Sequence, residues 1–366
     1  MEPIRIGVIG VGQIGKHHLD EYERIHEANV VAVADINATE LQSVANRYNV
    51  PHMYTNFREL LGRDDITAVD VCLHNNYHAQ VSVAAMRAGK HVYCEKPIAG
   101  SFADARTMVS VAQETGRKLH IQLANLYARE TRVAKRLIED GRLGRLYHAR
   151  STGFRRRGRP FVDGYGAKAF VNKQTAGGGA LFDMGVYHIS QMLYLLNLPT
   201  VERISGKIYQ ETAMDERRNL ESGYNVEELG MGFVRFGGGE TLDVIESWAI
   251  HLNQFEGSYV VGSLGGVRLY PLSFHHTLGD MDIDAAFNLD ADDFRRHALY
   301  ENEDAYDSSE RHWLAALQNR VDLLPTAELA LQTMLISEGI YLSDRLGREV
   351  EASEVRENSH STALDV

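Results

Sequence analysis

Three glycines near the start of the chain have the spacing that a nucleotide-binding turn requires. Gly10, Gly12 and Gly15 follow the apolar run IRIGVIG in a G-x-G-x-x-G pattern. The first glycine permits a sharp bend, the second lets the backbone approach a pyrophosphate, and the third lets the following helix pack closely on the strand. The amino end of that helix favours phosphate charge. The pattern predicts a dinucleotide-binding turn, with Gln13 and Ile14 beside the cofactor.

Asp35 ends the next apolar run, twenty positions after Gly15. A carboxylate at this place accepts hydrogen bonds from the hydroxyls of an adenosine ribose and repels a 2′-phosphate. No arginine occurs in the segment DINATE that begins at Asp35. The sequence therefore predicts NAD rather than NADP as the cofactor, with Ile36 also on the adenosine side.

Alternating strands and helices must position these residues. As far as about residue 125, short runs that are apolar on both faces are separated by amphipathic, helix-sized stretches. This alternation is typical of an α/β fold with a doubly wound parallel sheet that helices cover on both faces. We expect a Rossmann domain over residues 1–125, with strands at IRIGVIG, NVVAVAD, HMYT, VDVCLH, HVYCEK and KLHIQLA.

The rest of the chain, residues 126–366, has a different pattern. After a helix at RETRVAKRLIEDG and a glycine-rich stretch before ALFDMGVYHISQMLYLL, several strands follow one another without helices between them. Such strands favour antiparallel pairing, with a hairpin at RFGGGETL, and predict an α+β domain with a large, mostly antiparallel sheet. Two late helices close this domain, and the polar tail from EASEV is expected to fray or to make oligomer contacts.

Composition limits the classes of function. The 366 residues carry a net charge of −12, which disfavours a surface for nucleic acid or for an anionic membrane. No apolar run reaches the ~20 residues of a membrane span, and we expect no secretory leader. The two cysteines, Cys72 and Cys94, lie in strand-like runs, as expected for packed thiols in a reducing compartment. These features predict a cytoplasmic protein that binds neither nucleic acid nor membranes.

Two further motifs give a specific resemblance. CEKPIAG at residues 94–100 follows the fifth strand, and GGGALFDMGVYHISQMLYLL at residues 177–196 begins a helix of the second domain. With the glycine pattern, and with RFGGGETLDVIESWA and EGIYLSDRLGREV, they resemble the Gfo/Idh/MocA family, named for glucose-fructose oxidoreductase and inositol dehydrogenase. The resemblance covers essentially the whole chain. It implies a C-terminal open-faced sheet that often forms the interface of a homo-dimer or homo-tetramer, and a sugar or cyclic polyol as substrate.

The resemblance also implies roles for individual residues. Lys96 matches the family's active-site lysine, a cation that hydrogen-bonds the nicotinamide ribose and the reacting hydroxyl and so favours alkoxide character there. Glu95 matches a ribose-contacting acid. Asp183 matches a helix aspartate that orients the substrate and tunes the base.

The position of the general base departs from the common family pattern. Many relatives have a histidine four residues after the aspartate, whereas this chain has Tyr187 there, followed by His188. On an α-helix Tyr187 shares a face with Asp183, and His188 is rotated roughly 100° further. Histidine titrates near neutral pH, however, while a tyrosine needs its pKa lowered from about 10. We favour Tyr187 for proton transfer, with Lys96 lowering its pKa, and keep His188 as the second catalytic or substrate-binding candidate.

The loop LHNNYHAQ occupies the place of a cofactor-contacting turn in relatives, although the usual proline is missing. The resemblance therefore assigns Leu73, His74, Asn75 (or Asn76) and His78 to the cofactor. The spacing of His74 and His78 also fits a metal, but no third ligand is indicated, and we predict no metal site.

An arginine cluster suggests a property of the substrate. GFRRRGRP, residues 153–160, contains four arginines on a strand expected near the cofactor. Strand alternation puts Arg155 and Arg157 on one side, where they would bind a carboxylate, sulfonate or phosphate. The alternative is a solvated or subunit-interface charge run. We take Arg155 and Arg157 as candidate substrate-binding residues, with anionic sugars among the possible substrates.

Three function classes follow. The first is an NAD-dependent dehydrogenase that acts on a ring hydroxyl of a sugar, a sugar derivative or a cyclic polyol. The second, a class that the same family includes, is an oxidoreductive glycosidase, in which transient C3 oxidation, elimination, water addition and re-reduction hydrolyse a glycoside. The third is a non-catalytic protein that senses sugar or NAD, and the presence of both Lys96 and Asp183 argues against it. The choice between the first two stays open.

Overall fold

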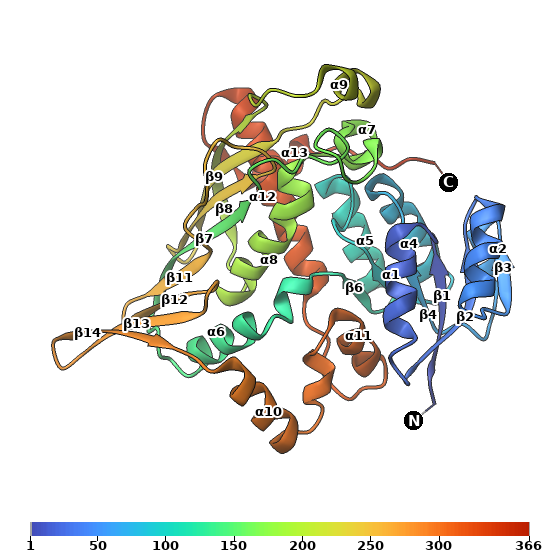
Figure 1. The fold of residues 1–366 in the computed structure, drawn as a ribbon, viewed down its shortest axis with the longest axis horizontal. Coiled ribbons are helices and arrows are strands. Elements are labelled where there is room, and N and C mark those ends of the chain that lie inside the picture. Colours follow the sequence, from blue (N-terminus) through green and yellow to red (C-terminus); the bar gives the residue numbers. More distant parts are fainter. Residues whose placement is uncertain (1, 366) are drawn as a thin grey trace.

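The first sheet belongs to the amino-terminal part of the chain. The computed structural model describes residues 2–365, and Figure 1 shows this sheet at one end of the molecule. Its strands pair in parallel in the order β3-β2-β1-β4-β5-β6, which confirms the predicted doubly wound sheet. The strands are β1 (Ile4–Ile9), β2 (Ala28–Ala34), β3 (His52–Tyr54), β4 (Ala68–Val71), β5 (His91–Cys94) and β6 (Leu119–Ile121). The helices between them are α1 (Gln13–Tyr22), α2 (Ala38–Arg47), α3 (Phe57–Leu61), the short η1 (Asn75–Tyr77), α4 (His78–Arg87) and α5 (Phe102–Thr115).

The strand order reverses between β1 and β4, and ligands of such sheets bind at the carboxyl ends of the strands beside this point. Gly10 follows β1, Asp35 follows β2, Leu73 comes two residues after β4, and Glu95 follows β5. Parallel pairing thus brings residues from four separate segments to one edge of the sheet.

The second sheet has nine strands in the order β14-β13-β12-β11-β7-β10-β9-β8-β15. β7 and β10 pair in parallel, and the other neighbours pair antiparallel, so the predicted mostly antiparallel sheet is confirmed. Gly239, with φ of 90°, forms the predicted turn between β9 and β10. The strands are β7 (Leu146–Phe154), β8 (Val201–Tyr209), β9 (Leu229–Phe236), β10 (Thr241–Ser247), β11 (Tyr259–Gly262), β12 (Gly265–Arg268), β13 (Ser273–Leu278), β14 (Met281–Ala286) and β15 (Val350–Glu351).

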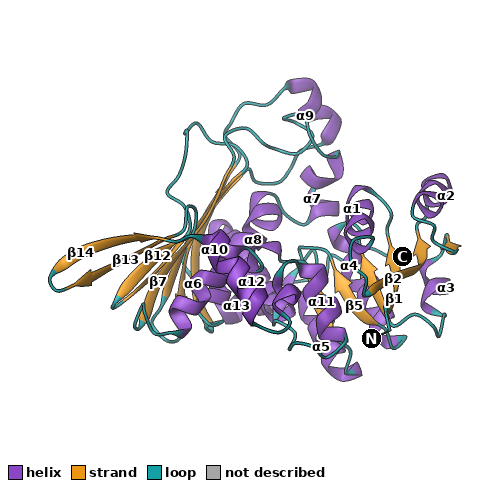
Figure 2. Ribbon diagram, turned by 60° about the horizontal axis from the view of Figure 1, so that its bottom comes forward, coloured by secondary structure: helices purple, strands orange, loops and turns teal. Residues whose placement is uncertain are grey.

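Helices cover one face of this second sheet. Figure 2 shows α8 and α12 between the two sheets, while no described helix lies on the outer face of the second sheet. The β13–β14 hairpin, α9 and α10 were not predicted, because their segments are mostly polar and exposed. The remaining helices and single turns are η2 (Ala124–Leu126), α6 (Arg129–Glu139), η3 (Lys168–Val171), α7 (Lys173–Ala176), η4 (Leu181–Gly185), α8 (Val186–Leu195), α9 (Glu216–Ser222), α10 (Leu289–Leu299), η5 (Glu303–Tyr306), α11 (Ser309–Leu317), α12 (Thr326–Leu346) and α13 (Ala352–Asn358). None of the described helices is long and apolar enough to cross a membrane.

One late segment of the chain packs on the first sheet rather than on the second. The first sheet ends at Ile121 and the second begins at Leu146, so we retain residues 1–125 and 126–366 as the proposed domains. However, α11 packs back on the first sheet, where Tyr93 donates a hydrogen bond to Glu310 at 3.0 Å and its ring stacks on Trp313.

The expectation that the tail frays is wrong. After α13 the chain runs along the first domain, where the Ser361 hydroxyl and the Thr362 N–H donate to the Asp104 carboxylate at 2.6 and 2.8 Å. The N–H of Leu364 donates to the carbonyl of Asn76 at 2.9 Å. The polar residues of the tail are therefore hydrogen-bonding partners of the Rossmann domain.

The glycine turn after β1 is shaped by close backbone approaches. Gly10 has a φ of 94°, and a Cβ there would lie 2.4 Å from the carbonyl oxygen of Cys72. A Cβ on Gly15 would lie 2.0 Å from the carbonyl oxygen of Gly10, whereas one on Gly12 would meet no atom within 4 Å. The first and third glycines are required by the fold, and the second borders open space.

The two kinds of glycine predict different effects on stability. Gly15→Ala should lower the free energy of unfolding by about 1–3 kcal/mol, because α1 must move away from the turn. Gly12→Ala should change it by less than about 0.5 kcal/mol. Urea unfolding of both variants measures this difference, and equal destabilisation would contradict the geometry described.

Candidate functional site

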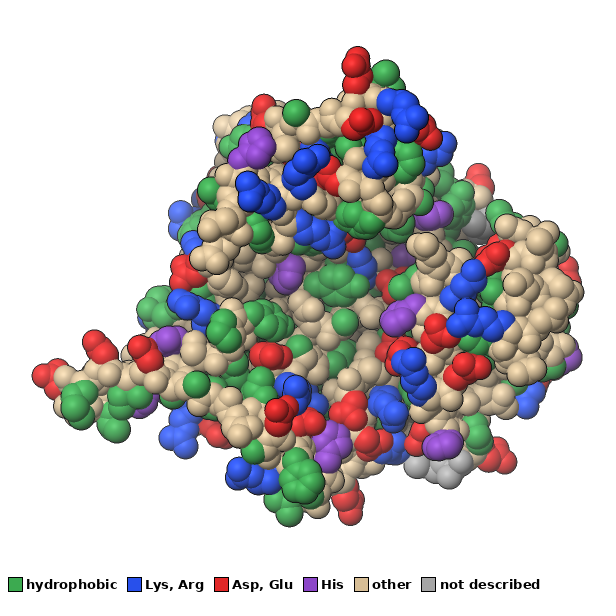
Figure 3. Space-filling model, in the orientation of Figure 1, with side chains coloured by type: hydrophobic (Ala, Val, Ile, Leu, Met, Phe, Trp, Pro, Cys, Tyr) green, Lys and Arg blue, Asp and Glu red, His purple; other side chains and the backbone are tan. Residues whose placement is uncertain are grey.

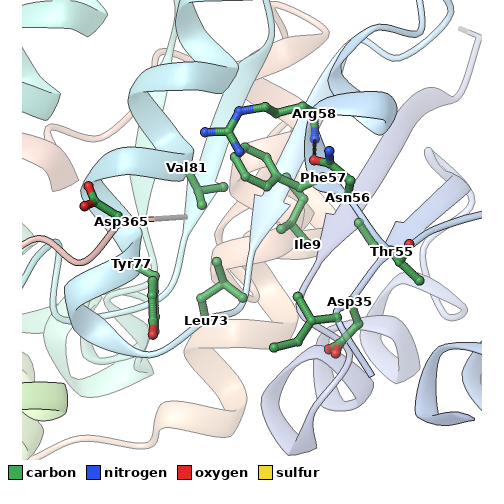
Figure 4. A pocket seen from close by; sticks show the side chains of 12 residues that line it. Ile9, Asp35, Thr55, Asn56, Phe57, Arg58, Leu73, Tyr77, Val81 and Asp365 are labelled. Atoms are coloured by element: carbon green, nitrogen blue, oxygen red, sulfur yellow. Dashed lines mark hydrogen bonds between the residues drawn. The ribbon is translucent and has the colours of Figure 1, made fainter. Parts of the chain in front are cut away.

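A cavity of about 440 Å³ lies at the carboxyl ends of β1 and β2. Figure 4 shows Asp35 at its lower edge, Arg58 and Phe57 across from it, and Asp365 of the C-terminal segment on the opposite side. Asp35 Oδ2 accepts from the N–H of Val11 at 2.9 Å, and Oδ1 accepts from the N–H of Asn37 at 2.8 Å. These bonds fix the carboxylate and leave further lone pairs facing the cavity.

Two features of this cavity suit the adenosine half of a dinucleotide. Ile36 lines it and is 92% exposed, which leaves an apolar surface for a ligand to cover. Arg58 also lines it, and its guanidinium carbon lies over the ring of Phe57, 4.7 Å from the ring centre. No pattern near Asp35 in the sequence pointed to Arg58, because it comes from α3.

The amino end of α1 lies next to this cavity. Gly12 is the N-cap residue of α1, and no side chain among the described residues caps it. The first N–H groups of a helix attract an anion, and the open space at Gly12 gives a pyrophosphate room to approach. The residues present therefore fit a bound dinucleotide, with Gln13 exposed at the first turn of the helix.

A second cavity, of about 270 Å³, lies where the two domains meet. Leu73 lines both cavities, so they are neighbouring parts of one cleft, and Figure 3 shows the surface hollowed between the domains. The second cavity brings together seven of the predicted site residues, namely Ile14, Leu73, Asn75, Glu95, Lys96, Asp183 and Tyr187.

An ion pair between the two domains lies in the second cavity. Lys96 Nζ donates to Asp183 Oδ1 at 2.9 Å and to the carbonyl oxygen of Asp183 at 3.0 Å. Burial lowers the pKa of Lys96, but the Asp183 carboxylate outweighs it and holds that pKa above its usual value. Burial raises the pKa of Asp183, and Lys96 more than compensates, so this pKa lies below its usual value. Both groups are charged at neutral pH.

Asp183 has two further partners. The indole N–H of Trp248 donates to Asp183 Oδ2 at 2.9 Å, and Arg155 Nη1 donates to the same oxygen at 3.4 Å. Trp248 is fully buried and was not among the predicted site residues. Its position directly after β10 was the available signal. With these donors and Lys96, the carboxylate of Asp183 is fixed in orientation.

Tyr187 contacts Lys96 through its ring. Lys96 Nζ lies 4.8 Å from the centre of the ring, over its face, which is a cation–π contact. Burial raises the pKa of Tyr187 to about 12, although Lys96 acts to lower it. The expectation that Lys96 brings this pKa below its usual value is therefore wrong, because burial is the larger effect.

His188 faces a different group. Its Nδ1 lies 3.0 Å from Glu246 Oε2, and Glu246 Oε1 accepts from the hydroxyl of Ser151 at 2.9 Å. Burial lowers the pKa of His188, but the fully buried Glu246 outweighs this and raises it above its usual value. A histidine oriented by a carboxylate is a typical proton-transfer pair. His188 does not line the second cavity as Tyr187 does.

A π-helical turn precedes α8 and carries Asp183. This turn, η4, replaces the continuous α-helix on which the shared face of Asp183 and Tyr187 was predicted, yet both residues contact Lys96. The carboxylate of Glu227 accepts from the N–H groups of Gly179 and Leu181, each at 2.9 Å, and so holds the start of the turn. Single π turns occur frequently at functional sites.

The loop after β4 joins the two domains. Asn75 donates to the carbonyl of Ala176 at 2.7 Å. His74 is exposed, with its ring edge against Phe170. His78 is fully buried, with its ring nitrogens 2.8 and 2.9 Å from the carbonyl oxygens of Pro97 and Leu73. His78 therefore holds the backbone of Leu73 and Pro97, two residues that line the second cavity, and itself lines neither cavity.

The arginine cluster does not converge on the site. β7 ends at Phe154, before the arginines, so strand alternation does not apply to them. Arg155 reaches Asp183, whereas the side chain of Arg157 is 71% exposed and lies 3.9 Å from Asp163. Arg159 is fully buried and paired with Asp163. The prediction that Arg155 and Arg157 lie on one side of a strand is wrong.

Known proteins share the two-domain organisation of the chain. Residues 4–123 match the family model described as "Oxidoreductase family, NAD-binding Rossmann fold", and residues 131–268 match the GFO/IDH/MocA C-terminal domain. The chain is 28% identical over 277 residues to D-glucoside 3-dehydrogenase of Escherichia coli K12, covering 74% of this chain and 78% of that protein. It is 30% identical over 149 residues to myo-inositol 2-dehydrogenase of Thermotoga maritima, covering 41% of this chain and 45% of that protein.

Solved structures share the fold. A levoglucosan dehydrogenase in complex with NADH has a TM-score of 0.78 at 20% identity, with 96% of this chain and 99% of that one covered. An aldose-aldose oxidoreductase from Caulobacter crescentus has a TM-score of 0.75 at 20% identity, with 96% and 100% covered. Both domains match family models, and the chain belongs to the Gfo/Idh/MocA oxidoreductase family, with an NAD-binding Rossmann domain.

Proposed function

We propose that the protein is an NAD-dependent dehydrogenase that acts on a ring hydroxyl of a sugar, a sugar derivative or a cyclic polyol. The observation that carries this proposal is the location of Lys96 and Tyr187 together in the cavity that adjoins the dinucleotide cleft. The names of the relatives, a glucoside 3-dehydrogenase and an inositol 2-dehydrogenase, support the substrate class. We also propose a homo-dimer or homo-tetramer that uses the outer face of the second sheet.

Bound NAD supplies the hydride acceptor, and the chain supplies groups that stabilise charge on the reacting oxygen. Lys96 uses two of its three N–H donors on Asp183, and the third has no partner among the described residues. A cation that stays charged and is held rigidly stabilises negative charge developing on a hydroxyl oxygen. We assign this role to Lys96 and the orienting role to Asp183.

Tyr187 is the proposed proton-transfer residue. With a pKa of about 12 it is protonated at neutral pH, so the resting site presents two donors, the Tyr187 hydroxyl and Lys96 Nζ. This state suits protonation of a carbonyl oxygen during reduction. In the oxidising direction the tyrosine must give up its proton first, which becomes easier as the pH rises.

The charges of the site favour a neutral substrate. Lys96, which lines the second cavity, and Arg155 are both paired with Asp183. An anionic sugar needs a cation without a competing carboxylate, and Arg157 points to solvent. We therefore propose a neutral sugar or polyol, with Arg155 and His188 as substrate-contacting residues.

An oxidoreductive glycosidase is the second candidate function. It requires a base besides the residue that acts on the oxidised hydroxyl, and it requires retained NAD. His188, oriented by Glu246, supports this candidate because it is a second titratable group on the same helix as Tyr187.

The first experiment identifies the reaction. We expect the protein to reduce NAD stoichiometrically with a member of a panel of neutral sugars, polyols and aryl glycosides, followed by absorbance of the reduced cofactor. Release of aglycone over many turnovers without net NADH would establish the glycosidase instead. Neither response over a broad panel, anionic sugars included, would contradict both.

The second prediction concerns Lys96. Lys96→Ala should lower kcat by about 10²–10⁴-fold, because the oxygen loses its main electrostatic stabilisation. Its affinity for NADH should change by less than about tenfold, the effect of one hydrogen bond. Steady-state kinetics and NADH fluorescence titration measure the two effects, and Lys168→Ala, an exposed lysine of η3, is the matched control. Full activity of Lys96→Ala would refute its catalytic role.

The third prediction separates Tyr187 from His188 by pH dependence. If Tyr187 accepts the proton, oxidation requires its deprotonated form, so kcat/KM rises with pH toward its pKa of about 12. We expect this profile, with a loss of about 10²–10³-fold in Tyr187→Phe. His188→Gln should keep the profile. If His188 is the base, kcat/KM instead stops rising once the pH exceeds the raised pKa of His188, and His188→Gln abolishes this pH dependence.

A further inference from the structure

A histidine in the core of the Rossmann domain connects α1 to the site. His18 is fully buried. Its Nδ1 lies 2.8 Å from Asp70 Oδ2, and its Nε2 lies 3.0 Å from Glu95 Oε1. Asp70 belongs to β4, and Glu95 follows β5. One ring therefore bridges two carboxylates that come from neighbouring strands of the sheet.

The two partners require a charged ring. An ionised carboxylate only accepts hydrogen bonds, and a histidine donates from both nitrogens only as the imidazolium. Burial lowers the pKa of His18, but Asp70 outweighs it and raises that pKa well above its usual value. Burial raises the pKa of Glu95, but His18 outweighs it, so Glu95 is ionised at neutral pH.

The other groups that face His18 are neutral. The Tyr22 hydroxyl donates to Asp70 Oδ2 at 2.8 Å, the Cys72 thiol lies 3.4 Å from His18 Nδ1, and the Tyr93 ring stacks 5.5 Å away. Burial raises the pKa of all three groups, so they keep their protons. The exposed His17 is its ring neighbour on α1, at 6.2 Å.

Glu95 connects His18 to the second cavity. Its Oε1 faces His18, and its Oε2 accepts from the backbone N–H of Lys96 at 2.9 Å. Glu95 lines that cavity together with Lys96 and Tyr187. The orientation of the Glu95 carboxylate is thus set by two contacts, one from the His18 ring and one from the backbone N–H of Lys96.

We propose that His18 is a positioning residue for the cofactor: its buried imidazolium keeps Glu95 ionised and oriented to accept hydrogen bonds from the nicotinamide ribose. This inference rests on the proposed role of Glu95 at that ribose. Without the imidazolium, Glu95 is an almost completely buried carboxylate whose remaining cationic neighbour is Lys96, itself paired with Asp183. Such a group takes up a proton more readily, and a protonated carboxyl has less capacity to accept.

The experiment compares NADH binding by the full chain of wild type, His18→Gln and Glu95→Gln at several pH values, by fluorescence titration. Glutamine retains a donor for Glu95 but carries no charge. His17→Gln is the matched control, since it removes an exposed histidine from the same helix. ADP is the control ligand, because it lacks the second ribose. His18→Gln/Asp70→Asn replaces the single variant if two unpaired carboxylates prevent folding.

We expect wild type and His17→Gln to bind NADH equally well from about pH 8 to about pH 5.5, because Glu95 stays ionised throughout. In His18→Gln the pKa of Glu95 rises, so NADH affinity should be near wild type at about pH 8 and about tenfold weaker at about pH 5.5. ADP affinity should be unchanged. Glu95→Gln should bind NADH weakly at every pH, and adding His18→Gln to it should cause no further loss.

Failure of the positioning role of His18 and failure of the proposed role of Glu95 give different results. NADH affinity of His18→Gln that matches wild type at every pH, while Glu95→Gln binds weakly, overturns the positioning role of His18 alone. Normal NADH binding by Glu95→Gln instead overturns the proposed role of Glu95. Loss of ADP affinity in His18→Gln would show a general defect of the domain and would likewise overturn the specific inference.

Discussion

Lys96 follows a strand of the first sheet, and Asp183 lies on the helical turn that faces it across the cleft, so their ion pair joins the two domains at the second cavity. Lys96, to which we assign the stabilisation of charge on the reacting oxygen, is oriented by a group from the other half of the chain. Removing one member of a largely desolvated pair leaves the other uncompensated, at a cost of up to about 3–5 kcal/mol. The proposed catalytic geometry and the docking of the domains therefore depend on the same contact.

The charges around this pair alternate in sign through the molecule. From the core of the Rossmann domain to the second domain, the order is Asp70, His18, Glu95, Lys96, Asp183 and Arg155, and the charges of Glu95 and Lys96 attract each other without a direct ion pair between their side chains. Each of the inner members has an opposite charge on both sides, so burial does not neutralise it. The alternation explains how a partly enclosed site keeps an ionised carboxylate, Glu95, and a cation, Lys96, side by side at the same pH.

The sequence predicted what local patterns specify and missed what depends on distant contacts. The glycine turn, Asp35 and the parallel strands follow from spacing and periodicity, while the resemblance identified Lys96 and Asp183. No pattern predicts that Trp248 holds Asp183, because 65 residues separate them in the chain. The burial that sets the pKa of Tyr187 is likewise a tertiary property. The prediction for the arginine cluster was wrong because β7 ends at Phe154, directly before the cluster, and side chains alternate between two faces only within a strand.

The path of the tail has a practical consequence for handling the protein. Asp365 lies at the rim of the adenosine cavity, so an affinity tag or a surface anchor fused to the carboxyl terminus would emerge close to the cofactor entrance. β1 enters the first sheet from the opposite edge, since the cofactor residues lie at the carboxyl ends of its strands. Fusion partners and immobilisation linkers therefore belong at the amino terminus, where the cleft stays accessible.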